Sequence, residues 1–247
     1  MNVPISQEIY IDPEELLYET SQNEIRPSDP YVYPNGILIN RFGIQDYEQL
    51  ALVEKEFLGH KVITTELVES ENLDYWLLKR IHAYIFNELF DWAGEFRTVP
   101  LVKAEKLFIP GLSIDYSPPS KIKREVCHIL NELNAIRWGN QSLDEISELF
   151  ATKIAQLWRV HPFRDGNTRA IMGYAKIYAY ERGFPMNMSY FTEILTAPKD
   201  ENGMQIGLSL RDMFVAACLD EFPEPQHLIA QFKKAILAYS LDENDKI

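Results

Sequence analysis

The sequence predicts a mainly α-helical fold, a bundle of about eight helices with one small β-hairpin. Two observations support this prediction. Apolar residues recur at helical spacing along much of the 247-residue chain, and capping residues, glycine or proline bound many of these runs. Residues 98–119 break the helical pattern and contain two short strand-like runs, 98–102 and 106–109, which we interpret as a two-stranded ribbon.

Two predicted helices lie at the centre of the chain and are joined by a short polar loop. The first begins at Ser142, which with Glu145 forms a capping-box pattern, and runs to Val160. Its apolar face is formed by Leu143, Ile146, Phe150, Ile154 and Leu157. The second resumes a helical period at Ile171, Tyr174, Ala175 and Tyr178, and Gly183 and Pro185 indicate its end.

Further helices are expected on both sides of this pair. Starts are predicted near Asp46, at Asn72 or Asp74, and at Ser120, and two closing helices are predicted over 212–219 and 227–239. We divide the chain into an N-terminal arm lying on the surface (1–45), a core (46–190) and a C-terminal helical extension (191–247).

Composition limits the function classes. The 46% of hydrophobic residues suffice for a sizeable core. The net charge of −13 argues against a general binder of the DNA phosphate backbone, which would need a basic face. The cysteines, Cys127 and Cys218, are expected to be free thiols. Without a signal-like start or a run long enough to span a membrane, a cytoplasmic protein is expected.

The loop at residues 161–169, here called the signature loop, concentrates reactive side chains. His161 is suited to accept a proton near neutral pH, and Asp165 is a hard oxygen ligand suited to Mg²⁺. Gly166 and Asn167 stand where the second helix begins, so their backbone N–H groups would face a phosphate, and Arg169 would grip further phosphate oxygens. We interpret this as a general base, a metal ligand and a phosphate cradle.

Each residue also has a structural interpretation. Asp165 would serve as a helix cap, Arg169 as a surface ion pair, and Phe163 as a core anchor that pins the loop. Arg164 is expected to face solvent and Trp92 to pack. The other histidines are expected to make structural hydrogen bonds only; they are His60, His82, His128 and His227.

The signature loop resembles the signature of the Fic family, His-x-Phe-x-Asp/Glu-Gly-Asn-Gly-Arg-x-x-Arg. The match covers His161, Phe163, Asp165–Asn167 and Arg169. Asp91-Trp92-Ala93-Gly94-Glu95-Phe96-Arg97 resembles the family's Asp-Trp-Ala-Gly-x-x-Arg segment, and residues 29–34 resemble the family's start. The resemblance extends over roughly residues 29–190.

The resemblance implies a protein adenylyltransferase that moves AMP from ATP to a Ser, Thr or Tyr hydroxyl of a target protein. His161 would be the base, Asp165 would hold Mg²⁺, and Gly166, Asn167, Thr168 and Arg169 would bind the nucleotide. Two positions depart from the signature: Thr168 replaces a glycine, and Met172 replaces the second arginine. They leave two alternatives open, a transferase that uses another phosphate-containing donor and a Fic-fold binding module without catalysis.

The resemblance also implies partners. The ribbon would be a flap on which a target segment docks as an added strand, with Lys103 and Phe108 as contacts, although Phe108 could equally belong to the core. A separate small antitoxin is a further expected partner. Glu69 only faintly resembles the family's inhibitory glutamate.

Overall fold

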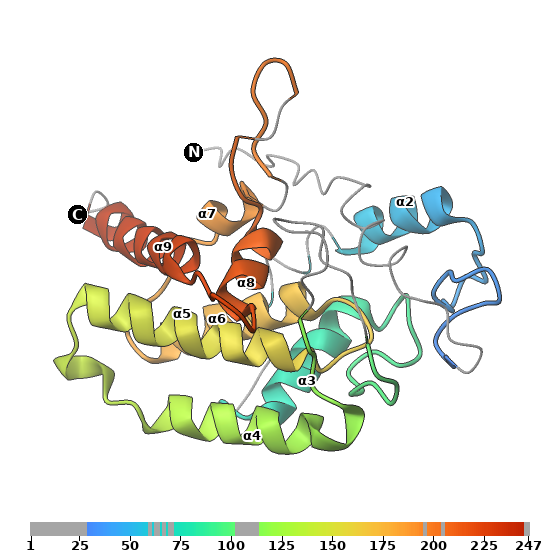
Figure 1. Cartoon of the computed structure of the whole chain (residues 1–247), viewed down its shortest axis with the longest axis horizontal. Coiled ribbons are helices and arrows are strands. Elements are labelled where there is room, and N and C mark those ends of the chain that lie inside the picture. The colour runs from blue at the N-terminus through green and yellow to red at the C-terminus, as the bar shows by residue number, and fades with distance from the viewer. Residues whose placement is uncertain are drawn as a thin grey trace, which may run out of the picture.

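A computed structural model of the chain describes residues 29–58, 61, 65, 68, 72–101, 114–194, 197–203 and 206–244. Over these residues it is mainly helical, which confirms the predicted fold class (Figure 1). The α-helices are α2 (Tyr47–Leu58), α3 (Tyr75–Phe86), α4 (Pro119–Ala135), α5 (Leu143–Val160), α6 (Asn167–Glu181), α7 (Ser189–Thr192), α8 (Leu210–Cys218) and α9 (Gln226–Asn244). A 3-10 helix, η2 (Trp138–Asn140), precedes α5.

Helix α5 lies at the centre of the molecule. It packs against α4 on one side and against α8 and α9 on another, and α6 lies beside it (Figure 1). Helix α3 packs against α6, so both neighbours of the signature loop are enclosed by other helices. Since the side chains of Phe150, Ile154, Leu157 and Trp158 are fully buried, the loop is held between rigid elements.

The helix starts follow the predicted capping signals. The Ser142 hydroxyl accepts a hydrogen bond from the Glu145 N–H, and the Glu145 carboxylate accepts one from the Ser142 N–H, which completes the predicted capping box of α5. Of the two predicted starts of α3, Asp74 is the N-cap residue and accepts from two backbone N–H groups. The Asp46 carboxylate accepts from the Gln49 N–H at the start of α2.

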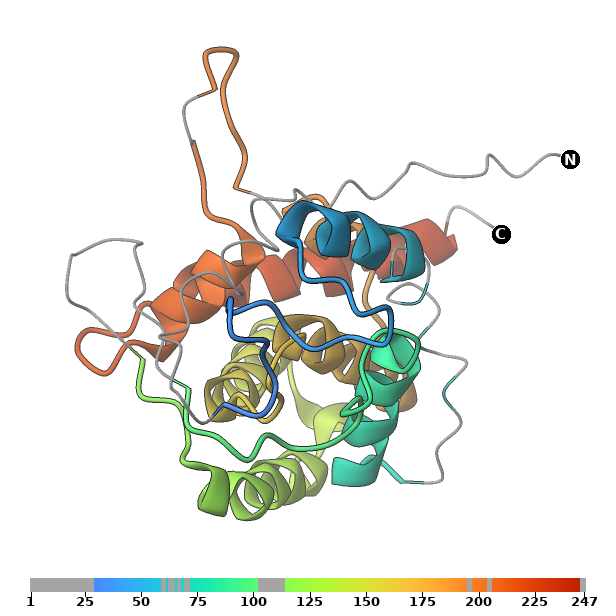
Figure 2. The same ribbon diagram turned by 90° about the vertical axis from the view of Figure 1, so that its right-hand side faces the viewer.

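Residues 29–45 correct one expectation. They were predicted to belong to a surface arm, yet Tyr31 and Leu38 are buried and belong to the hydrophobic core. An isolated bridge joins Val32 to Leu38, and the Arg41 N–H donates to the Leu89 carbonyl beyond α3. This segment crosses one face of the helical body (Figure 2). Its partners are far away in the sequence, so local pattern could not reveal its burial.

Of the predicted ribbon, residues 98–101 are described and are not part of a strand, whereas residues 102 and 106–109 lie outside the described residues. Lys103 and Phe108 also lie outside them. His60 and Glu69 are also outside them. None of the described helices has the length and apolar character needed to cross a bilayer. Both cysteines, Cys127 and Cys218, are free thiols as predicted.

Candidate active site

The signature loop joins α5 to α6 through two residues with left-handed backbone. His161 ends α5 with φ of 50° and ψ of 61°, and its N–H donates to the Trp158 carbonyl. Gly166 precedes α6 with φ of 70°. A histidine in this conformation is uncommon and costs free energy that the surrounding contacts must offset. The chain therefore turns sharply at both ends of the loop.

The His161 imidazole is 1% exposed and packed between aromatic rings. Its centroid lies 4.1 Å from that of Tyr116 and 5.2 Å from that of Trp158. Nδ1 lies 3.3 Å from the Trp158 carbonyl oxygen. Because a carbonyl only accepts, this contact places the proton on Nδ1 and leaves the lone pair on Nε2, the tautomer that a general base needs.

Arg97 fixes the backbone on which His161 is carried. Its guanidinium donates to the carbonyls of His161 (2.7 Å), Val99 (2.8 Å) and Ser117 (2.5 Å), and its backbone N–H donates to the Pro162 carbonyl (2.9 Å). Burial lowers the pKa of Arg97 to about 10, which still leaves it charged at neutral pH. A single cation thus ties the end of α5 to the segments that precede α4 and follow α3.

Asn167 and His82 close the loop from inside. The Asn167 amide accepts from the Phe163 N–H at 2.8 Å and donates to the Phe163 carbonyl at 2.9 Å. The Phe163 ring stacks on His82 with centroids 3.9 Å apart, which confirms it as a core anchor. His82 accepts from the Gly94 N–H through Nδ1, so its Nε2–H donates to the Asp165 carbonyl. His82 therefore has the structural role predicted for it.

Gly166 meets a steric requirement as well as a conformational one. A Cβ built on it would lie 2.2 Å from the Phe86 ring, and its φ of 70° disfavours other residues. Glycine therefore lets the Phe86 ring lie against the residue that caps the start of α6. Unpartnered N–H groups and the helix dipole make such a position attractive to anions.

Two carboxylates and one guanidinium surround this helix start. The Arg169 Nη2 lies 3.5 Å from the Asp165 carboxylate, and its Nη1 lies 3.8 Å from the Glu54 carboxylate of α2. The guanidinium also lies over the Phe86 ring, 4.7 Å from its centroid. Within the residues that the structure describes, the buried Arg169 Nη1 makes no hydrogen bond. Arg169 therefore retains donor capacity for an anion at this place.

The two departures from the Fic signature have different environments. The Thr168 hydroxyl accepts from the indole N–H of Trp158 at 2.9 Å, so it links α6 to α5. Met172 is 3% exposed and belongs to the hydrophobic core. Thr168 remains next to the loop, whereas Met172 contributes apolar packing.

Arg164 was expected to face solvent, and this expectation is wrong. Its side chain is 3% exposed and forms an ion pair with Asp29. Other residues around the site were not singled out from the sequence, notably Glu54 and Tyr116. Glu54 had a detectable signal, since it follows Leu50 by four residues and precedes Phe57 by three on the buried face of α2. For Tyr116 no sequence signal was available.

A family comparison decides what this arrangement is. The model of the Fic/DOC family matches residues 72–175, which contain Gly94, Arg97 and the whole signature loop. Residues 72–175 form a Fic domain. The Fic core predicted from the sequence is wider, 46–190, and its boundaries stay a prediction.

Similar proteins agree with this assignment. The chain is 30% identical over 164 residues to the protein adenylyltransferase VbhT of Bartonella schoenbuchensis, a match that spans 64% of this chain and 32% of VbhT. It is 26% identical over 166 residues to the probable protein adenylyltransferase y4lH of Sinorhizobium fredii, which spans 65% of this chain and 80% of y4lH. The chain thus spans about a third of the length of VbhT and most of y4lH.

Solved structures show the same fold. The BepC protein of Bartonella tribocorum, with bound AMPPNP, superposes with a TM-score of 0.62 at 20% identity over 83% of this chain and 95% of that one. The Fic domain of a Bartonella quintana effector, with bound ADP, gives a TM-score of 0.64 at 22% identity over 83% and 93% of the two chains. The Fic helical fold is therefore shared beyond the range of close sequence similarity.

Proposed function

We propose that this chain is a protein adenylyltransferase, which transfers AMP from ATP to a hydroxyl side chain of a target protein. One observation carries the proposal: within the Fic domain, a single loop brings a buried His161 and the glycine-capped start of α6 together. VbhT is named a protein adenylyltransferase and y4lH a probable one, and two similar Fic structures hold adenine nucleotides.

The proposed chemistry follows from the residues in place. His161 Nε2 takes the proton of a target Ser, Thr or Tyr hydroxyl, and the hydroxyl oxygen attacks the α-phosphorus of ATP. The new bond joins that oxygen to the α-phosphate, the bond to the β-phosphate breaks, and pyrophosphate leaves. The N–H groups of Gly166 and Asn167 and the Arg169 guanidinium stabilise the charge that develops on the phosphate oxygens, and Thr168 completes the nucleotide-binding set.

Asp165 is our proposed Mg²⁺ ligand. Magnesium usually binds one or two carboxylates together with substrate phosphates, and Asp165 supplies one carboxylate beside the phosphate cradle. Among the described residues no group of three or more His, Cys, Asp or Glu side chains could hold a metal ion by itself. The ion would neutralise phosphate charge during transfer.

Further parts of the proposal concern partners and place. We propose that a target segment docks on a flap near residues 98–109, with Lys103 and Phe108 as contacts. A separate antitoxin as regulator and a cytoplasmic location also remain proposals. A different phosphate-containing donor is the main alternative. The position of the second arginine of the signature is occupied by the buried Met172, so no arginine is available there to hold the triphosphate.

Label transfer tests the proposal. Purified protein is incubated with Mg²⁺, host lysate and ATP labelled separately at the α- and γ-phosphates, beside the His161→Asn variant. We expect protein label from the α-phosphate alone, absent in the variant. Label from the γ-phosphate only would show that the chain transfers a phosphoryl group instead of AMP. No label from either would support the alternatives, a different donor or a binding module.

A further inference from the structure

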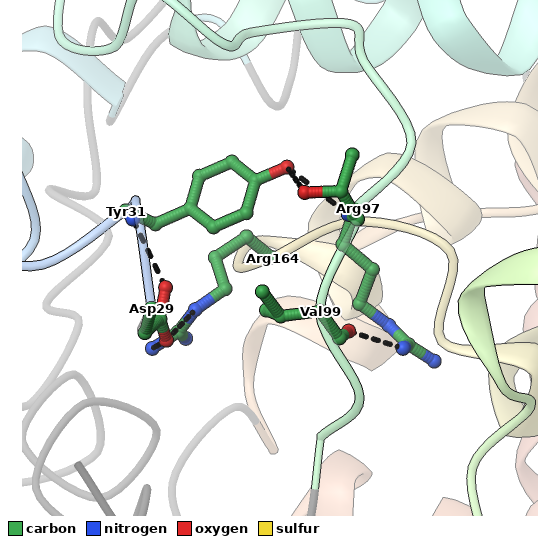
Figure 3. A network of polar contacts seen from close by, with 6 residues as sticks. Asp29, Tyr31, Arg97, Val99 and Arg164 are labelled. Atoms are coloured by element: carbon green, nitrogen blue, oxygen red, sulfur yellow. Dashed lines mark hydrogen bonds and ion pairs between the residues drawn. The ribbon is translucent and has the colours of Figure 1, made fainter. Parts of the chain in front are cut away.

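Residues upstream of the Fic domain reach into the signature loop. The Asp29 Oδ2 atom accepts hydrogen bonds from both Nε (3.1 Å) and Nη2 (2.9 Å) of Arg164 (Figure 3). The Asp29 Oδ1 atom accepts from the Tyr31 N–H at 2.9 Å. Both carboxylate oxygens therefore accept hydrogen bonds, and the guanidinium donates to Asp29 through two of its own N–H groups.

The Asp29–Arg164 ion pair is withdrawn from solvent. The two side chains are 11% and 3% exposed, whereas another ion pair, Lys233 with Asp144, has side chains that are 44% and 75% exposed. A buried ion pair is weak evidence for stability, because the loss of hydration offsets much of the attraction. Removing one partner is nevertheless costly, since it leaves the other as an uncompensated buried charge.

A second anchor lies at Tyr31. Its hydroxyl accepts from the Thr98 N–H at 3.1 Å and lies 3.2 Å from the Thr98 hydroxyl. Thr98 follows Arg97, whose guanidinium holds the His161 carbonyl. The Tyr31 ring also packs edge-on against Trp92, with centroids 5.6 Å apart. Residues 29–31 thus touch the loop through Arg164 and the residue beside Arg97 through Tyr31.

The position of Arg164 in the sequence makes this contact relevant to chemistry. It stands three residues after His161 and directly before Asp165. Asn167 fixes the backbone of Phe163 and His82 holds the Asp165 carbonyl, so each flank of Arg164 has an internal anchor. Asp29 supplies the anchor of Arg164 itself, and it comes from outside the matched residues 72–175.

We infer that Asp29 is a positioning residue of the active site: its carboxylate holds Arg164 and thereby fixes the signature loop in the shape that transfer requires. The inference rests on the proposed function for its catalytic consequence. It extends the working site to residues 29–31, so a Fic domain cut to residues 72–175 would lack one anchor of its own loop. Small displacements of reacting groups are costly, about 100-fold for 1 Å.

The test compares three variants of the full chain: Asp29→Asn, Arg164→Gln and their combination, with Asp144→Asn as the matched control at an exposed ion pair. Asparagine keeps the oxygen for the Tyr31 N–H but presents an amide to Arg164. Hydrogen exchange of residues 161–169 is measured by mass spectrometry, and kcat for AMP transfer is measured far below the unfolding temperature. The KM for ATP is recorded alongside.

We expect faster exchange in the loop and a kcat about 100-fold lower for each single variant. The double variant should be no slower than the slower single, because both remove the same contact. Asp144→Asn should match the wild type in both measurements. A variant Asp29→Asn that unfolds at lower temperature but keeps wild-type loop exchange and kcat would overturn the inference.

The two proposals fail separately. If the wild-type chain transfers no AMP, the proposed function is wrong, and loop exchange alone decides the inference. Faster exchange in Asp29→Asn then still supports positioning by Asp29, and unchanged exchange rejects it. If Asp29→Asn does not fold, Arg164→Lys replaces it, because lysine keeps the charge but cannot present both donors of the fork.

Discussion

At the scale of single residues, His161 joins a chemical role to an unusual backbone. His161 is the C-cap residue of α5 and has a left-handed φ of 50°. Its imidazole packs against the rings of Trp158 and Tyr116. Residue types differ in how well they tolerate this conformation, and asparagine is enriched there. The choice of substitution therefore decides whether a loss of activity reports chemistry or misfolding.

We predict that His161→Asn lowers kcat for AMP transfer by about 10²- to 10⁴-fold, the usual contribution of a general base. Asparagine tolerates the left-handed backbone, so the melting temperature should stay near that of the wild type, whereas His161→Ala should lose stability as well. Rates from labelled ATP and thermal unfolding measure the two effects. Wild-type activity in His161→Asn would remove His161 from the mechanism.

The second prediction concerns Gly166→Ala, with Gly183→Ala as its control. Both have positive φ, 70° and 83°, but a Cβ meets the Phe86 ring only at Gly166 and meets nothing within 4 Å at Gly183. Gly183→Ala should cost about 1 kcal/mol from backbone strain alone, and Gly166→Ala about 3 kcal/mol or more. Urea unfolding measures both costs. Equal losses would mean that Phe86 moves aside freely.

His82 gives the site a pH dependence of stability. Burial lowers its pKa from 6.5 to about 3 in the folded protein. The unfolded chain therefore binds more protons below pH 6.5, so the stabilisation is complete above pH 6.5 and is lost progressively as the pH falls toward 3. At pH 5 the loss is about 2 kcal/mol.

Removing His82 should remove that slope. His82→Asn keeps an acceptor for the Gly94 N–H, and its unfolding free energy should vary less between pH 6.5 and 5 than that of the wild type. The control is His128→Asn, because the His128 side chain is 71% exposed. Urea unfolding at a series of pH values measures both. Identical slopes in His82→Asn and wild type would contradict the assigned role.

At the scale of elements, the site depends on helices that pack from different sides. Helix α5 carries His161, α6 begins the phosphate cradle, α3 contributes Phe86 and His82, and α2 contributes Glu54. Glu54 is 3% exposed and lies 3.8 Å from Arg169. This contact should orient the guanidinium, since Asp165 holds its other end.

We predict that Glu54→Gln raises the Kd for ATP by about tenfold, the lower end of losses seen when a supporting partner of a ligand-binding residue is removed. Glu56→Gln, on the exposed side of α2, is the matched control and should bind like the wild type. Calorimetric titration with ATP and Mg²⁺ measures both. Tighter binding in Glu54→Gln would show instead that Glu54 competes with phosphate for Arg169.

At the scale of the whole molecule, the sequence predicted the helices and the central loop well and the contacts between distant segments poorly. The caps of α3 and α5 could be predicted from local pattern, since capping depends on neighbours within one helical turn. The free thiols could be predicted from the number and spacing of the cysteines. The burial of Arg164 could not, because its partner Asp29 is 135 residues away. The same holds for Tyr31 with Thr98, 67 residues apart.

The reactivity of the buried Cys218 thiol can be used to test the packing of α8 on α5. Burial raises its thiol pKa to about 12, and its sulfur donates to the Ala155 carbonyl of α5. We expect a thiol reagent at pH 8 to leave Cys218 intact in the folded chain and to modify it only on unfolding. Mass spectrometry of a Cys127→Ser variant in increasing urea measures this. Modification at the rate of a free thiol in native buffer would contradict the packing of α8 on α5.

The most direct measurement of the central claim is the stoichiometry of transfer. Pyrophosphate released and AMP bound covalently to protein are quantified in one reaction with Mg²⁺, ATP and lysate. The proposed mechanism predicts equal molar amounts of the two products with the wild-type chain, and neither above background with His161→Asn. Pyrophosphate without protein-bound AMP, or equal products from both chains, would contradict transfer of AMP to protein by His161.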